Sequence, residues 1–167
     1  MFLYPKLYIE NVTKLDCEFL NKNNIKGLIL DVDNTLIDYD KKPIDGLEIW
    51  CQELKHNNIK LCILSNSNKK EKVKKIAEDL DIPFIYFAKK PLKFGFKKAK
   101  KILELENKNI AVVGDQIATD VLGANRCKMF SILVKPISEK DIWITKLKRP
   151  LENYIIHRYL EKNKWNV

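Results

Sequence analysis

The chain has 167 residues, of which 46% are hydrophobic and 32% are charged. This length predicts one domain, spanning residues 1–167, that can bury a core without disulfides or structural metals. Four cysteines are scattered without a CxxC spacing, which argues against a disulfide framework or a zinc site and suits a reducing cytoplasm.

The formal net charge is +9, which favours an anionic partner: a phosphorylated substrate, an anionic membrane surface or nucleic acid. The alternative is that the many Lys, Asn and Ile residues reflect AT-rich codon usage. No apolar run approaches the roughly 18–20 residues that span a bilayer. The N-terminus lacks the apolar stretch of a signal peptide. We therefore expect a cytoplasmic protein.

Apolar periodicity predicts strands that alternate with helices along most of the chain. The expected strands are 26–31, 58–64, 84–87, 110–114 and 129–134, and the expected helices are 13–23 (capped by Thr13), 44–57, 69–80, 91–103 and 117–126. This alternation predicts an α/β fold with a three-layer, doubly wound, mostly parallel sheet.

Both ends of the chain depart from the alternation. The aromatic and apolar residues of 1–12 could pack on the domain or lie against a membrane, and packing is the default for so short a segment. Residues from about 140 to 163 are expected to form an amphipathic helical extension that is interrupted near Pro150.

Two carboxylates end the strand at 26–31. Asp31 and Asp33 are two residues apart, so an extended backbone puts them on the same side. Such a like-charge pair is costly unless a cation binds it or one carboxyl keeps its proton. A DxD sequence alone is also common in solvated turns, so the other strand ends decide its meaning.

Polar residues occupy the other strand ends as well. They are Ser65 and Asn66 after the second strand, Lys90 before the helix at 91–103, and Asp115 with Asp120 after the fourth strand. Because ligands in doubly wound sheets bind at the carboxyl ends of the strands, we expect these residues to converge. Phosphoryl transfer requires a nucleophile, neutralisation of charge, and hydrogen-bond donors that point at the equatorial oxygens of the phosphoryl group.

Simpler explanations exist for single members of this set. Ser65 could be a strand-end turn residue, and Asp120 could be a first-turn residue favoured by the helix dipole. Lys89 or Lys93 could substitute for Lys90. We prefer Lys90 because Pro91 fits the first turn of the following helix.

Four motifs resemble those of the haloacid dehalogenase (HAD) superfamily of phosphatases. They are DVDNTL at 31–36, Ser65-Asn66 after an apolar strand, Lys90-Pro91, and GDQIATD at 114–120. They occur in the family's order and cover most of 26–134. The resemblance implies a HAD-like Rossmannoid fold and a type IIIA phosphatase, similar to the YqeG-like subfamily. Eukaryotic relatives of that subfamily are mitochondrial phosphatidylglycerophosphate phosphatases.

The resemblance also implies roles for these residues. Asp31 would be the nucleophile that forms an aspartyl-phosphate, and Asp33 would be the general acid and base. Lys90 would offset the repulsion between Asp31 and the phosphate, and Ser65 with Asn66 would hold the phosphoryl group.

The implied cofactor is Mg²⁺. Its ligands would be the carboxylates of Asp31 and Asp115 and the backbone carbonyl of Asp33. Asp120 would either bind the ion directly or support its ligands.

The intervals at 35–44 and 68–85 are too short for a folded cap domain, so we expect an open site that suits a bulky or lipid-linked phosphate ester. The resemblance implies phosphatidylglycerophosphate as a candidate substrate. The alternatives are a phosphatase of a soluble metabolite, and a basic RNA- or ribosome-binding protein on a HAD scaffold. No RNA-binding signature supports the last of these, so nucleic acid is not the expected partner.

Peripheral contact with the inner face of an anionic membrane is a further expectation. The lysines between 89 and 101 border the expected site, although their outer members could form a solvated helix face. Aromatic residues of both termini could settle at a membrane boundary; they are Phe2, Tyr4, Trp143, Tyr154 and Trp165.

Overall fold

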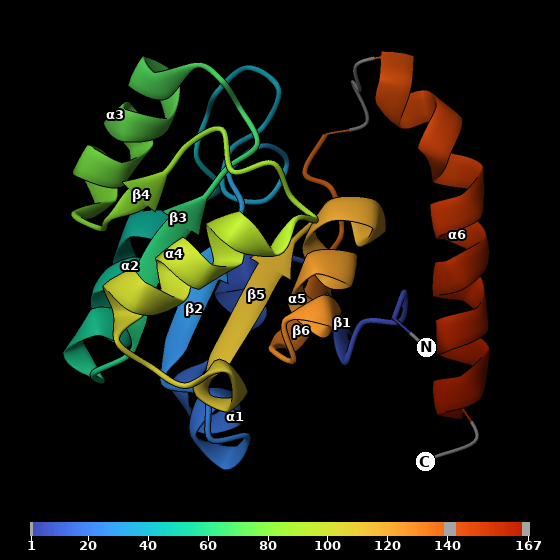
Figure 1. The fold of residues 1–167 in the computed structure, drawn as a ribbon, viewed down its shortest axis with the longest axis horizontal. Coiled ribbons are helices and arrows are strands. Elements are labelled where there is room, and N and C mark those ends of the chain that lie inside the picture. Colours follow the sequence, from blue (N-terminus) through green and yellow to red (C-terminus); the bar gives the residue numbers. More distant parts are fainter. Residues whose placement is uncertain (1, 139–142, 165–167) are drawn as a thin grey trace.

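Six parallel strands form a single sheet in the order β1-β6-β5-β2-β3-β4 (Figure 1). The computed structural model describes residues 2–138 and 143–164, and only the backbone of 143–149 and of Lys164. The strands are β1 (Leu7–Ile9), β2 (Gly27–Leu30), β3 (Lys60–Leu64), β4 (Phe84–Ile85), β5 (Ile110–Gly114) and β6 (Phe130–Val134). The predicted α/β class and parallel sheet are confirmed.

Helices cover both faces of this sheet, which gives three layers. They are α1 (Cys17–Lys22), α2 (Leu47–His56), α3 (Lys70–Leu80), α4 (Lys93–Leu103), α5 (Leu122–Arg126) and α6 (Trp143–Lys164). Alternate strand residues face opposite layers. Leu28 and Leu30 pack with the first three helices, whereas Ile29 packs with α4 and α5.

Short irregular turns complete the element order. Two 3₁₀ turns, η1 (Val12–Lys14) and η2 (Asn107–Asn109), precede α1 and β5. A π-helical turn, η3 (Ile117–Val121), leads from the end of β5 into α5. No folded insertion lies between the elements described, and the intervals at 35–44 and 68–85 contain no cap domain.

The N-terminal segment differs from the prediction. No strand was predicted here, but β1 extends the sheet beside β6, so Leu7, Tyr8 and Ile9 pack on the domain, which is the default for so short an apolar segment. The helix predicted at 13–23 is wrong at its start, because Asp16, not Thr13, caps it. The Asp16 carboxylate accepts a hydrogen bond of 2.8 Å from the Phe19 backbone N–H.

Two prolines behave differently from the prediction. Pro91 lies ahead of α4, whose N-cap is Leu92, so it is outside the first turn. The extension at 140–163 is helical as expected, but α6 continues through Pro150 instead of breaking there. A proline removes one backbone hydrogen bond and favours a kink, which a helix of this length survives.

α6 lies along the side of the domain next to α5 and η3 (Figure 1). Its buried Ile155 packs with Ile117, Val121 and Leu133. The backbone N–H of Ile117 donates a 3.0 Å hydrogen bond to the Glu152 carboxylate. Among the helices described, none combines the length and apolarity needed to cross a membrane.

The core depends strongly on Phe96 of α4, which is completely buried. A Cβ atom added at Gly123 would overlap the Phe96 ring, so the two helices α4 and α5 meet at this residue pair. We predict that Phe96→Ala lowers the free energy of unfolding by about 3–5 kcal/mol, measured by urea denaturation. Phe94→Ala, on the exposed side of the same helix, should cost less than about 1 kcal/mol. Equal costs would contradict this packing.

Candidate active site

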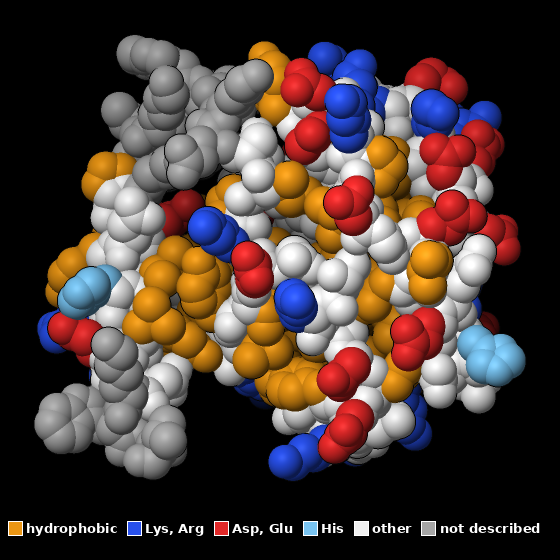
Figure 2. All heavy atoms as spheres, turned by 180° about the vertical axis from the view of Figure 1, so that it is seen from behind, with side chains coloured by type: hydrophobic (Ala, Val, Ile, Leu, Met, Phe, Trp, Pro, Cys, Tyr) orange, Lys and Arg blue, Asp and Glu red, His pale blue; other side chains and the backbone are white. Residues whose placement is uncertain are grey.

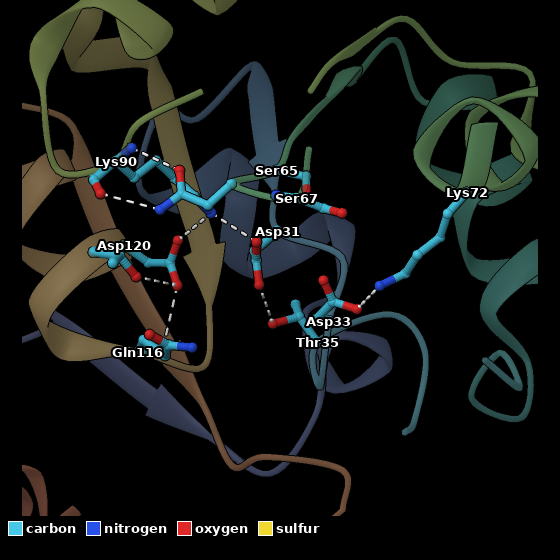
Figure 3. Close-up of polar contacts among 11 residues, drawn as sticks. Asp31, Asp33, Thr35, Ser65, Ser67, Lys72, Lys90, Gln116 and Asp120 are labelled. Atoms are coloured by element: carbon cyan, nitrogen blue, oxygen red, sulfur yellow. Dashed lines mark hydrogen bonds and ion pairs between the residues drawn. The ribbon is translucent and has the colours of Figure 1, made fainter. Parts of the chain in front are cut away.

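The register of the central strands aligns the residues that follow them. Leu30 of β2 pairs with Ile63 of β3 and with Val113 of β5. Asp31 therefore follows its strand close to where Ser65 and Asp115 follow theirs. Figure 3 shows Asp31, Ser65, Lys90 and Asp120 at this edge of the sheet, so the expected convergence is present.

Lys90 lies at the centre of the site. Its Nζ is 2.6 Å from Asp31 Oδ1 and 2.6 Å from Asp120 Oδ1, and its side chain is almost completely buried. Burial alone would lower the pKa of Lys90, but Asp120 and Asp31 raise it above its usual value. Lys89 is exposed, with its Nζ 5.0 Å from the centre of the Phe87 ring. Of these two lysines, Lys90 is therefore the one that lies beside Asp31 and Asp120.

Asn66 fixes the backbone of Lys90. Its side-chain amide donates to the Lys90 carbonyl at 3.0 Å and accepts from the Lys90 N–H at 2.6 Å. This reciprocal pair ties the end of β3 to the loop that carries the lysine. Sequence reasoning missed this contact, since nothing local indicates a partner 24 positions away.

Ser65 is buried at the end of β3. Its hydroxyl oxygen accepts a 3.1 Å hydrogen bond from the Ser67 N–H, and a hydroxyl that accepts can also donate to an anion. Its backbone carbonyl accepts from Ala88 N–H at 2.9 Å, which holds the segment before Lys90 against the strand.

Three buried carboxylates lie together beside Lys90. Asp31, Asp115 and Asp120 each offer an oxygen within 4.8 Å of the others. Burial raises the pKa of Asp31 to about 6, although Lys90 opposes the shift. Burial, with Asp31 and Asp120 nearby, also raises the pKa of Asp115 well above its ordinary value.

Asp115 Oδ1 is buried and has no hydrogen-bond partner among the residues described. A divalent cation would give this oxygen a partner and would stabilise the ionised carboxylates around it. The donor set consists of oxygens, which is the preference of a hard cation such as Mg²⁺. The residues present therefore fit a divalent metal ion.

The position of Asp120 depends on its own loop. Its Oδ2 accepts from the Gln116 N–H at 3.2 Å and from the Thr119 hydroxyl at 3.4 Å (Figure 3). A Cβ atom at Gly114 would collide with the Asp120 carboxylate. Glycine at this position is therefore what lets the carboxylate lie against the end of β5.

Asp33 lies apart from the buried group and is half-exposed. Its carboxylate forms an ion pair with Lys72 of α3 (Figure 3). No sequence pattern singles out Lys72, which is one of several lysines on that helix. Behind Asp31, the buried Thr35 hydroxyl donates to Asp31 Oδ2 at 3.4 Å, a second contact that was not anticipated.

Lys72 also borders a hollow with a volume of about 1090 Å³. The hollow lies between the residues around 37–49 and helix α3. Most of its wall is apolar, including Ile37, Leu47 and Ile76, and charged side chains surround it.

Comparison with known proteins shows which family the chain belongs to. The family model described as mitochondrial PGP phosphatase matches residues 1–137. The chain belongs to this family. The match includes all four motifs and every strand, and α6 lies beyond it.

Two curated proteins are similar to the chain. "Probable phosphatase YqeG" of Bacillus subtilis is 40% identical over 156 residues, which cover 93% of this chain and 90% of that protein. Phosphatidylglycerophosphate phosphatase 1, chloroplastic/mitochondrial, of Arabidopsis thaliana is 25% identical over 179 residues. That alignment covers 96% of this chain but only 49% of the plant protein. The resemblance to YqeG-like HAD phosphatases is confirmed, and the protein is a phosphoric monoester hydrolase.

Solved structures agree on the fold. An uncharacterized protein from Listeria monocytogenes serotype 4b superposes with a TM-score of 0.57 at 18% identity, over 71% of this chain and 85% of that one. The cobalt-bound deoxy-D-mannose-octulosonate 8-phosphate phosphatase of Haemophilus influenzae gives 0.52 at 18% identity, over 82% and 90%. At these identities the likeness extends to the fold alone.

The Asn66 contact leads to a prediction. Asn66→Ala removes both hydrogen bonds to the Lys90 backbone, so the lysine should no longer be held against Asp31. We expect kcat on an aryl phosphate to fall about 10- to 100-fold. Asn68→Ala, at an exposed position on the same loop, is the matched control and should stay near wild type. Unchanged turnover in Asn66→Ala would contradict a positioning role.

Proposed function

We propose that the protein is a magnesium-dependent phosphomonoesterase that acts through an aspartyl-phosphate on Asp31. The contact of buried Asp31 with Lys90 is the observation that carries this proposal. It keeps a carboxylate oxygen next to an ammonium group at the open edge of the sheet. A carboxylate in this setting is suited to attack phosphorus, while the ammonium offsets its repulsion from the phosphate.

In the proposed reaction, an Asp31 oxygen attacks phosphorus and the bond from phosphorus to the ester oxygen breaks. Asp33 gives its proton to the leaving oxygen. It then takes a proton from the water that attacks the aspartyl-phosphate, which releases inorganic phosphate and restores Asp31. The half-exposed position of Asp33 suits a group that exchanges protons with solvent.

The remaining residues bind the phosphoryl group and the metal ion. We assign the Ser65 hydroxyl and the Asn66 backbone to the phosphoryl oxygens. We assign the Asp31 and Asp115 carboxylates and the Asp33 carbonyl to Mg²⁺, which when bound neutralises charge on the phosphoryl group. The unpartnered Asp115 oxygen supports this assignment. Asp120 already contacts Lys90, so we assign it to holding that lysine beside the carboxylates that would hold the ion.

We further propose phosphatidylglycerophosphate as the substrate. The name of the Arabidopsis relative supports this choice. The described chain has no cap over the site, and the hollow beside Lys72 gives an amphiphilic leaving group room next to Asp33. We expect kcat/KM for this lipid in detergent micelles to exceed that for glycerol 3-phosphate and hexose phosphates. The reverse order would favour a soluble metabolite.

The nucleophile assignment is tested by Asp31→Asn, which removes a nucleophilic oxygen and a metal ligand together. Turnover of an aryl phosphate with Mg²⁺ should fall by at least about 1000-fold. The circular dichroism spectrum should be unchanged. Asp40→Asn, an exposed residue of the following loop, is the matched control and should retain activity. If Asp31→Asn turns over near the wild-type rate, another residue is the nucleophile.

The dependence on magnesium should change with pH in a defined direction. Because burial raises the pKa of Asp31 to about 6, the metal-free carboxyl is protonated below that pH. A proton and Mg²⁺ compete for the same oxygens, so the Mg²⁺ concentration for half-maximal activity should rise as pH falls. One displaced proton predicts roughly a tenfold rise per pH unit below the pKa. A constant half-saturation from about pH 5 to about pH 7 would rule out this competition.

A further inference from the structure

Exposed apolar side chains gather beside the loop that carries Lys90. Eleven large hydrophobic side chains are exposed in the described part of the chain, and five of them lie between residues 86 and 102. They are Tyr86, Phe87, Leu92, Phe94 and Ile102. We call the exposed side chains of 86–102 the α4 surface. Such a concentration on a short segment is typical of an interaction site.

The same segment is strongly basic. Residues 82–103 contain seven lysines and no aspartate or glutamate, and of these lysines Lys90 is buried in the site. Three rings of the surface have a lysine ammonium over them. Lys70 lies 5.9 Å from the Tyr86 ring, Lys89 lies 5.0 Å from Phe87, and Lys98 lies 4.5 Å from Phe94.

The α4 surface is continuous with the active-site edge. On α4, Phe94, Lys98 and Ile102 are spaced four residues apart, so they share one side of the helix. Tyr86, Lys98 and Ile102 line a shallow hollow of about 550 Å³. At the other end, Phe87 and Leu92 flank Lys90 in the sequence.

The opposite side of the molecule has a different character. Figure 1 shows α4 in front of the sheet, and Figure 2 shows the molecule from behind. There, Asp and Glu side chains are interspersed with lysines and apolar groups. At the C-terminal end of α4, Glu104 and Glu106 follow the helix, and Asp81 lines a hollow together with Ile102.

We propose that the α4 surface binds an anionic lipid bilayer, with α4 lying along the membrane and the Lys90 loop facing the head groups. Apolar tips flanked by long basic side chains suit this interface, because the tips enter the acyl boundary while the ammonium groups reach the phosphates. RNA is disfavoured, since Leu92 and Ile102 cannot stack on bases and lysines lie over the three ring faces.

This assignment replaces the termini as the expected membrane contact. Phe2 is exposed, but the next residues, Leu3 and Tyr4, are partly buried, and the centre of the Tyr4 ring lies 5.3 Å from the Lys162 ammonium. Tyr154 is exposed, but its helix also carries Glu152 and Glu161. The side chain of Trp143 and all of Trp165 lie outside the described residues.

Vesicle flotation tests the proposal on the full chain. Vesicles with phosphatidylglycerol or phosphatidylserine should bind the protein, and neutral phosphatidylcholine vesicles should not. Added salt should weaken binding, because it shortens the screening length below the roughly 8 Å of physiological ionic strength. Either anionic lipid should support binding, since the lysines of the surface are attracted to negative charge and not to one particular head group.

Matched double variants locate the contact. Leu92→Ser with Phe94→Ser removes side chains that are 53% and 64% exposed, and should weaken binding at least about tenfold. Leu151→Ser with Tyr154→Ser removes side chains that are 63% and 59% exposed on α6, and should change binding less than about twofold. Loss of binding in the α6 variant alone would overturn the proposal in favour of the termini.

The biological role of the α4 surface rests on the proposed phosphatase function. Activity on a soluble aryl phosphate tests that function separately from membrane binding. Both double variants should match the wild type, because neither changes a residue that contacts the reacting groups. An inactive wild type that still floats with anionic vesicles would overturn the function but not the surface. Equal binding to all vesicles, or none, would overturn the surface. So would retention on single-stranded oligouridylate that the α4 variant alone loses.

Discussion

The ion pairs of Lys90 with Asp31 and Asp120 are the constraint on which the rest of the site depends. All three groups are buried, where an isolated charge is strongly destabilising. One ammonium cannot balance three carboxylates once Asp115 is included, so the site carries an excess of acidic groups. Burial raises the pKa values of Asp31 and Asp115, and this excess of acidic groups adds to the shift. The excess also explains why a divalent cation is the natural complement to the site.

Each partner in this group comes from a different part of the fold. The strands β2 and β5 deliver Asp31 and Asp115 at their carboxyl ends. The loop before α4 delivers Lys90, whose backbone the Asn66 side chain holds, and the turn after β5 delivers Asp120. The parallel register of the strands brings these side chains to the same edge of the sheet. The positions of the charged groups therefore depend on the whole sheet.

The strand ends were the part of the molecule that sequence could predict best. Long apolar runs mark β2, β3, β5 and β6, and the polar residues that follow them must meet if the sheet is parallel. β1 escaped prediction because a three-residue edge strand is too short to show a period. The start of α1 was misplaced because Thr13 and Asp16 are both good caps, and only packing chooses between them.

The contacts that the sequence could not predict are long-range and specific to side chains. The Lys72–Asp33 ion pair joins α3 to the first motif across 39 positions, and the Asn66 amide reaches the Lys90 backbone across 24. Neither residue type is unusual for its location. Lys90 is the lysine that contacts Asp31, but the reason given for preferring it does not hold, since Pro91 lies ahead of the first turn of α4.

The hydrogen bond from Ile117 to Glu152 has a consequence for how this protein could be recombined with its relatives. The family match ends at residue 137, yet Glu152 lies on α6, beyond that boundary. The Glu152 carboxylate accepts the hydrogen bond of the first backbone N–H of η3, the turn that carries Asp120. A chimera that joins this catalytic core to another C-terminus would leave the Ile117 amide without that acceptor. The core and α6 should therefore be exchanged together as one module.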